Sequence, residues 1–175
     1  MGLANYLTIT RIIILPLFLV LFFSNYVHNN ITAGLVLIIS SLTDFLDGYV
    51  ARKYDQTTHL GRLLDPLADK ITVIAVFIAF AVKDLLSLEI IMIIVAREFV
   101  VLIGSIIMYF SEEDIISPSK IGKLATFLLY ISALAYIFDV QGLKTIIFVA
   151  VGMTLISGAH YSLKAVQYFS NDKGL

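Results

Sequence analysis

The stretch ITAGLVLIISSLTDFLDGYVARKYDQTTHLGRLLDPLADKITVIAVFIAFAV, from Ile31 to Val82, consists of two apolar runs on either side of a charged segment. The charged part, Asp44 to Lys70, holds five aspartates and four lysines and arginines. The flanking runs are almost free of charge and are each long enough for several helical turns. Apolar runs joined by a short polar connection are typical of helices that cross a bilayer.

The composition extends this interpretation to the whole chain of 175 residues, which is 59% hydrophobic and 14% charged, whereas a soluble domain carries about 25% charged residues. The runs are continuously apolar rather than alternating, which favours helices over a β-barrel. We predict an all-α integral membrane protein with six transmembrane helices in one bundle, forming a single domain over residues 1–175. The six apolar runs are Leu7–Val27, Ile31–Leu46, Leu67–Val82, Leu85–Tyr109, Ile121–Phe138 and Thr145–Tyr161.

The basic residues indicate how the bundle is oriented. Lys83 and Lys144 lie at one set of helix ends, and most other basic residues lie at the opposite set: Arg11, Arg52, Lys53, Arg62, Lys70, Lys120, Lys123, Lys164 and Lys173. Because basic residues are retained on the cytoplasmic side, we expect both termini and the charged segment at the cytoplasmic face of the cell membrane. The chain has no cysteine, which excludes disulfides, thiolate metal sites and cysteine nucleophiles. No nucleic-acid partner is expected.

The aspartates of the charged segment have helical spacing. Asp44 and Asp47 are three residues apart, and Asp65 and Asp69 are four apart, so each pair lies on one face of its helix. Four carboxylates at neighbouring helix ends would repel one another unless a cation neutralised them. Oxygen ligands without histidine or cysteine suit Mg²⁺, Mn²⁺ or Ca²⁺ better than zinc. The alternative is that the aspartates only cap helices and extend to the interface between membrane and water.

Two divalent ions would balance the four carboxylates and leave positions open for phosphate oxygens. Arg52 adds a planar set of donors for such oxygens. Gly48, Ala51 and Gly61 remove bulk where a phosphate-bearing substrate would approach the helices, although they could equally be packing residues. The segment is therefore typical of phosphoryl transfer.

The same segment resembles the signature of the CDP-alcohol phosphatidyltransferases. The matching positions are Asp44, Asp47, Gly48, Ala51, Arg52, Gly61, Asp65 and Asp69. The resemblance extends over the whole chain, because the family has six transmembrane helices with this motif on the second and third. It implies that CDP-diacylglycerol is the donor, that CMP leaves, and that an alcohol accepts the phosphatidyl group.

The resemblance also implies a role for each aspartate. Asp44, Asp47 and Asp65 would be metal ligands, and Asp69 would be a ligand that also acts as general base on the attacking hydroxyl. The cofactor would be Mg²⁺ or Mn²⁺, with two ions, and the enzyme would be a homodimer. Asn5 and Thr8 resemble an element near the nucleotide site of the family, although a helix cap next to a basic anchor explains them equally well.

Three basic residues are candidates for binding the acceptor. Arg97, in the middle of the fourth apolar run, is an anion ligand or else the partner of Glu98 in a structural pair. Lys120 and Lys123 lie at the start of the fifth run, where they either anchor the helix or form a pocket with Arg97 for a phosphorylated acceptor.

The acceptor itself is predicted from resemblance. The elements LLDPLADK, AREF and Gly122–Lys123 resemble the branch that makes phosphatidylglycerol phosphate from glycerol 3-phosphate. That branch usually has a lysine where this chain has Ala125, before Thr126. Cardiolipin synthases, which use phosphatidylglycerol as acceptor, often lack this lysine and are the alternative. A divalent-cation transporter is a further alternative, which the apolar mid-span positions disfavour.

Overall fold

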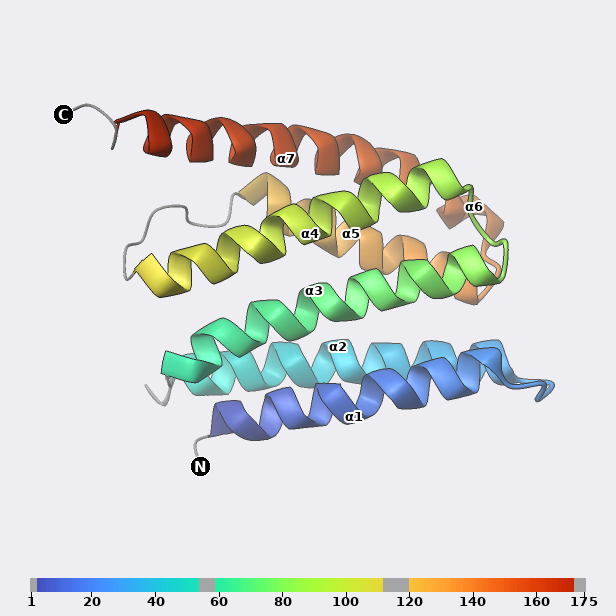
Figure 1. Cartoon of the computed structure of the whole chain (residues 1–175). Helices are drawn as coiled ribbons and strands as arrows, with labels where there is room; N and C mark the ends of the chain where they lie inside the picture. Colours follow the sequence, from blue (N-terminus) through green and yellow to red (C-terminus); the bar gives the residue numbers. More distant parts are fainter. Residues whose placement is uncertain (1–2, 54–58, 112–119, 172–175) are drawn as a thin grey trace. The chain divides into compact units, whose positions relative to one another are not determined.

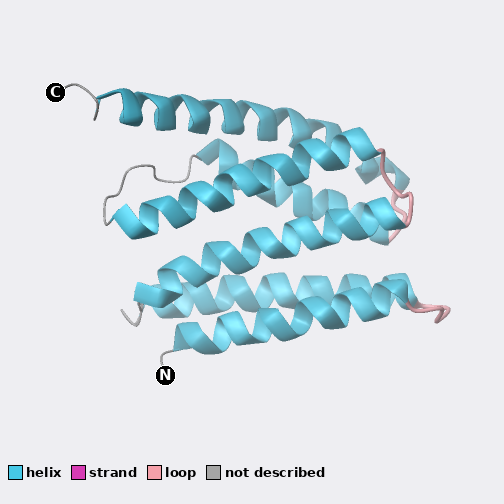
Figure 2. Ribbon diagram, viewed as in Figure 1, coloured by secondary structure: helices cyan, strands magenta, loops and turns pink. Residues whose placement is uncertain are grey.

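The computed structural model describes residues 3–53, 59–111 and 120–171, and within them the side chains of residues 13–43, 67–104, 106 and 121–159. These ranges form helices joined by short turns, without a strand (Figure 2). The helices are α1 (Leu3–Phe23), α2 (Asn29–Lys53), α3 (His59–Val82), α4 (Leu88–Ser111), α5 (Lys120–Ile137), the short α6 (Gln141–Lys144) and α7 (Ile146–Asn171). The all-α prediction is confirmed.

Apart from the short α6, each helix of the described residues corresponds to one of the six apolar runs, but the helices and the runs differ in length. α2 continues to Lys53 and α3 begins at His59, so both helices extend well into the charged segment. One segment of the described chain, Gln141–Ala159, is both long and apolar enough to cross a membrane, and three shorter apolar helical stretches are Ile13–Phe23, Asn29–Thr43 and Ile121–Ile137. Six membrane spans therefore remain a prediction.

The chain divides into two compact units. The first contains α1, α2, α3 up to Thr72, and the segment Ile137–Asp139. Its main packing is between α1 and α2, which lie side by side and run in opposite directions (Figure 1). Phe18 and Phe22 are buried on α1 and stack with ring centroids 5.4 Å apart, and Ala33 and Leu37 are buried on α2.

A single asparagine closes the turn between α1 and α2. The Asn29 side-chain amide donates to the carbonyl of Ser24 at 2.7 Å, and its side-chain oxygen accepts from the backbone N–H of Asn30 at 2.7 Å. The Ser24 hydroxyl donates to the carbonyl of Leu21 at 2.8 Å. These bonds satisfy backbone groups that the helix ends leave open, and they hold the two helices antiparallel.

The second unit contains α3 from Val73, together with α4, α5, α6 and α7. α4 and α7 are in contact and run in the same direction (Figure 1). Beyond the fully buried Ile147, the buried residues in the described part of α7 are small or short, with Ala150 and Thr154 fully buried and Ser157 almost so. Small residues allow the backbones of two helices to approach closely.

Two helices of the described chain, α3 and α5, end in the same way. Asp84 after α3 and Asp139 after α5 have left-handed backbones, with φ of 51° and 56°. Leu85 N–H then donates to Phe80 O at 3.0 Å, and Val140 N–H to Ala135 O at 2.9 Å. This is the pattern of a Schellman cap, in which the left-handed position is usually a glycine.

Large apolar side chains point outward on most helices. They include Ile13, Leu17 and Val20 on α1, Leu35, Ile39 and Leu42 on α2, and Phe148, Leu155 and Ile156 on α7. Exposed apolar surface on this scale is unusual for a soluble monomer. A helix that contacts lipid needs an apolar surface of this kind.

Candidate active site

The first part of the candidate site is the C-terminal half of α2. Asp44, Asp47, Gly48 and Ala51 all lie on this continuous helix, at successive positions i, i+3, i+4 and i+7, which share one helical face. Arg52 lies one residue further on. The helical spacing that the sequence predicts for this motif is therefore present in the backbone.

The second part is the N-terminal half of α3. Gly61, Asp65 and Asp69 lie on this helix at intervals of four residues, so they too share a face. Because α3 begins at His59, Pro66 lies in the interior of the helix rather than in its first turn. Proline in a helix interior removes one backbone donor.

The two halves belong to the same compact unit. Only residues 54–58 separate the end of α2 from the start of α3, so the two helix ends are at most about 22 Å apart, the length of six fully extended residue steps. Asn5 and Thr8 lie on α1 of this unit. The side chains of these two residues and of Asp44, Asp47, Gly48, Ala51, Arg52, Gly61 and Asp65 lie outside the described set.

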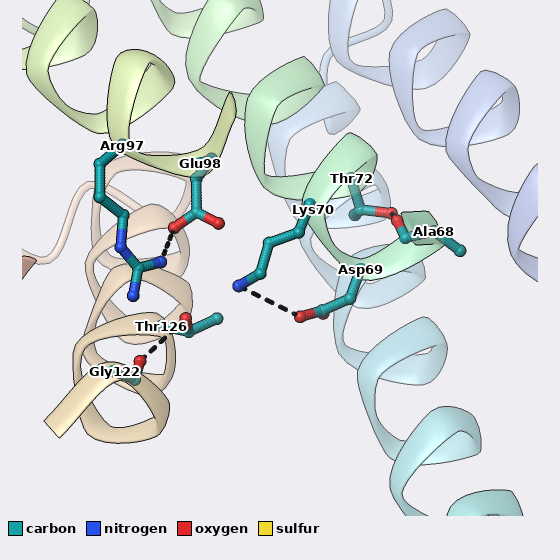
Figure 3. Close-up of polar contacts among 8 residues, drawn as sticks. All are labelled: Ala68, Asp69, Lys70, Thr72, Arg97, Glu98, Gly122 and Thr126. Atoms are coloured by element: carbon teal, nitrogen blue, oxygen red, sulfur yellow. Dashed lines mark hydrogen bonds and ion pairs between the residues drawn. The ribbon is translucent and has the colours of Figure 1, made fainter. Parts of the chain in front are cut away.

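Asp69 is the aspartate of the motif whose side chain the structure describes. Its side chain is 30% exposed, and Oδ2 lies 3.8 Å from Nζ of the buried Lys70 (Figure 3). Half-exposure leaves the carboxylate accessible to a ligand. Lys70 was expected only as a cytoplasmic anchor, and nothing in its spacing indicates that it lies beside the proposed base.

The donor set fits a hard divalent metal by its chemistry. Carboxylate oxygens are the ligands that Mg²⁺ and Mn²⁺ prefer, and the four aspartates lie on the two helices that the short connection joins. Among the described side chains, no group of three or more His, Asp or Glu residues comes together. Asp44, Asp47 and Asp65 lie outside that search, so the metal cluster stays a prediction.

The buried charges of the second unit lie on α4. Nη1 of Arg97 donates to Oε1 of Glu98, and the two side chains are 7% and 0% exposed (Figure 3). The pairing of these residues, one of the two possibilities that the sequence raises, is therefore present. Nε of Arg97 is buried and has no hydrogen-bond partner among the described residues. Arg97 thus retains donor capacity, and its role as an anion ligand stays a prediction.

The start of α5 carries the two candidate lysines. Lys120 is its first residue, with a side chain outside the described set, and Lys123 is exposed. Thr126 donates from its hydroxyl to the carbonyl of Gly122 at 3.1 Å. Ala125, where the sequence lacks the expected lysine, is fully buried. Position 125 therefore belongs to the packed face of α5.

Comparison with known proteins decides the family. A family model for the CDP-alcohol phosphatidyltransferases matches residues 1–157. The chain belongs to this family. The aspartate motif that resembles the signature of this family lies on two consecutive helices of the chain, α2 and α3.

Curated relatives of this CDP-alcohol phosphatidyltransferase match over nearly their full length. The protein from Rickettsia typhi is 34% identical over 180 residues, covering 96% of this chain and 99% of its own. The Aquifex aeolicus protein is 32% identical over 178 residues, covering 94% and 96%. The Bacillus subtilis protein is 29% identical over 183 residues, covering 93% and 94%. Each is named CDP-diacylglycerol–glycerol-3-phosphate 3-phosphatidyltransferase.

The sequence did not reveal every residue that shapes this region of the phosphatidyltransferase. A Cβ added to Gly158 on α7 would lie 3.7 Å from Cγ of Arg97, so this glycine forms the surface on which the arginine stem lies. Gly158 is separated from Arg97 by two helices along the chain. Its only signal in the sequence is its place among small residues of the last apolar run.

Proposed function

We propose that this enzyme transfers the phosphatidyl group from CDP-diacylglycerol to glycerol 3-phosphate, giving phosphatidylglycerol phosphate and CMP. The observation that carries the proposal is the near-complete coverage of relatives named for this reaction. The unbroken helices under the aspartate motif support it, because the spacing of the motif presents carboxylates only if both segments are helical.

The chemical step needs a base for the acceptor hydroxyl, and Asp69 takes this role. The 1-hydroxyl of glycerol 3-phosphate loses its proton to the Asp69 carboxylate while its oxygen forms a bond to the phosphatidyl phosphorus. The bond from that phosphorus to the CMP oxygen then breaks. The half-exposed carboxylate of Asp69 is accessible for this transfer.

Four carboxylates would hold the cofactor, two Mg²⁺ or Mn²⁺ ions. They are Asp44, Asp47, Asp65 and Asp69. When bound, divalent ions neutralise charge on the pyrophosphate and on the leaving CMP. Arg52 would donate to phosphate oxygens, and Gly48, Ala51 and Gly61 would let the donor approach the helix backbones, with Asn5 and Thr8 near its nucleotide.

The acceptor phosphate would bind to Arg97, Lys120 and Lys123. The guanidinium of Arg97 keeps an Nε–H without a partner among the described residues, and Lys123 is exposed. A dianionic phosphate suits such donors, because hydrogen bonds between ionised groups are about twice as strong as neutral ones.

The same proposal includes the membrane arrangement. It comprises six spans in a single domain, both termini and the active site at the cytoplasmic face of the inner or plasma membrane, and a homodimer. The outward apolar side chains of α1, α2 and α7 support a lipid environment. The span Gln141–Ala159 is consistent with it.

Purified protein in liposomes that contain CDP-diacylglycerol tests the reaction. We expect CMP release with glycerol 3-phosphate and Mg²⁺, and none with free glycerol or after addition of a chelator. Asp69→Asn is the matched inactive control. CMP release with phosphatidylglycerol and not with glycerol 3-phosphate would assign the cardiolipin synthase reaction, which Ala125 favours. Cation flux without CMP release would assign a transporter.

A further inference from the structure

The pairing of Arg97 with Glu98 is unusual because the two residues are neighbours in sequence. Adjacent side chains on a helix point about 100° apart around its axis and do not face each other. The hydrogen bond from Nη1 of Arg97 to Oε1 of Glu98 therefore requires the arginine side chain to turn along the helix surface. Since the guanidinium is planar, fixing one of its edges also fixes the direction of its other N–H groups.

The stem of the same arginine is held by a different helix. α4 packs on α7, and the position where a side chain of Gly158 would begin lies 3.7 Å from Cγ of Arg97. That distance is ordinary van der Waals contact, so the glycine leaves room for the stem and little beyond one methyl group. Arg97 is thus held at its stem by α7 and at its head by Glu98.

We propose that Glu98 and Gly158 are positioning residues of the acceptor site, which hold the Arg97 guanidinium in the one orientation that meets the phosphate of glycerol 3-phosphate. The inference rests on the proposed function. It assigns neither residue a contact with the substrate. Nε of Arg97 has no hydrogen-bond partner among the side chains that the structure describes, and its N–H is the donor that this orientation would leave for the acceptor.

The direction in which the acceptor KM changes in Glu98→Gln shows whether Glu98 orients Arg97 or only neutralises its charge. If Glu98 only neutralises Arg97, then Glu98→Gln removes a negative charge near a bound dianion and should lower the acceptor KM or leave it unchanged. If Glu98 orients Arg97, the weaker neutral hydrogen bond of glutamine should raise the acceptor KM by about 5- to 10-fold. The donor KM should change less than about twofold in either case.

The glycines of α7 provide a second test that changes no charge. Gly158→Leu should displace the Arg97 stem and raise the acceptor KM by about tenfold or more, whereas Gly158→Ala should be close to the wild type. Gly152→Leu is the matched control, because an added Cβ there meets nothing within 4 Å. Binding of glycerol 3-phosphate alone, measured by calorimetry, should weaken in Gly158→Leu and Glu98→Gln and not in Gly152→Leu.

The possible results separate the inference from the function. If the wild type releases no CMP with glycerol 3-phosphate, the proposed function fails. If the wild type is active and Arg97→Lys raises the acceptor KM, but Glu98→Gln and Gly158→Leu behave like Gly152→Leu, only the positioning inference fails. An equal rise of both KM values in Glu98→Gln and Gly158→Leu would also overturn it, since that indicates general damage to the fold.

Discussion

The ring of Phe138 occupies the space in which a side chain at Gly34 would begin. A Cβ built on Gly34 would clash with three atoms at the end of this ring, with Cε1 at 2.8 Å and Cε2 at 3.0 Å. Phe138 follows the last residue of α5, and Gly34 lies in the second turn of α2. The side chain of Phe138 thus packs against the glycine of α2, the helix that also carries the first two aspartates of the motif.

This contact predicts a graded loss of stability at Gly34. Gly34→Leu should lower the free energy of unfolding by about 1 to 3 kcal/mol, because the extra carbons overfill a packed site. Gly34→Ala should cost less, since only the end of the Phe138 ring has to move. Thermal unfolding of the purified protein in detergent measures both, with Gly152→Leu as a control at a position that has space. A similar loss of stability in the control would contradict the role of the contact between Gly34 and Phe138.

The aspartate motif predicts two classes of inactive variant. Asp44→Asn, Asp47→Asn and Asp65→Asn should each abolish CMP release and weaken binding of CDP-diacylglycerol, because the proposed metal site would lose a charged ligand. Asp69→Asn should be equally inactive but should retain more donor binding if its main role is that of the base. Turnover assays and donor-binding measurements on the four proteins make the comparison. Equal loss of donor binding in all four would assign Asp69 a metal role alone.

Lys123 tests the acceptor pocket with little risk to the fold, since its side chain is exposed. Lys123→Ala should raise the KM for glycerol 3-phosphate by about tenfold through loss of a charge-assisted contact, and should leave the KM for CDP-diacylglycerol nearly unchanged. Lys144→Ala, at the opposite helix ends, is the control for loss of one positive charge. A variant whose acceptor KM matches that of the control would remove Lys123 from the site.

The left-handed caps predict that a substitution can stabilise the protein. Asp84 has φ of 51°, a conformation that costs an L-residue about 1 kcal/mol or more and costs glycine almost nothing. Asp84→Gly should therefore raise the free energy of unfolding by about 0.5 to 1 kcal/mol, and Asp84→Val should lower it. Thermal unfolding of the two variants measures the difference. Destabilisation by glycine would show that the Asp84 side chain contributes more than its backbone costs.

The sequence predicts the number of helices better than their ends. Long apolar runs predicted one helix each, but the run that ends at Leu46 belongs to a helix that continues to Lys53. An apolar run of sequence ends where the apolar environment of the helix ends. The backbone hydrogen bonds of the helix can continue beyond that point. The spacing of the aspartates indicates these extensions better, because Asp44 and Asp47 share a face only if the segment between them is helical.

Contacts between distant segments could not be predicted. Gly34 and Gly158 have no local feature that distinguishes them from Gly152, and only the fold shows which of them lies against a side chain. For Arg97 and Glu98 the sequence raised two possibilities without deciding between them. Their pairing depends on side-chain rotamers, which a single sequence does not specify.

The adjacency of Arg97 and Glu98 bears on how the protein would enter the membrane of the proposed arrangement. An arginine alone at the centre of a span costs about 2.5 to 3.5 kcal/mol on insertion scales, and an acidic residue costs a similar amount. A pair formed between two helices would leave each charge exposed to lipid until both helices had left the translocon. Because this pair closes within α4, the fourth helix of the proposed bundle can partition into the bilayer as a neutral segment during synthesis, before α5 and α7 exist.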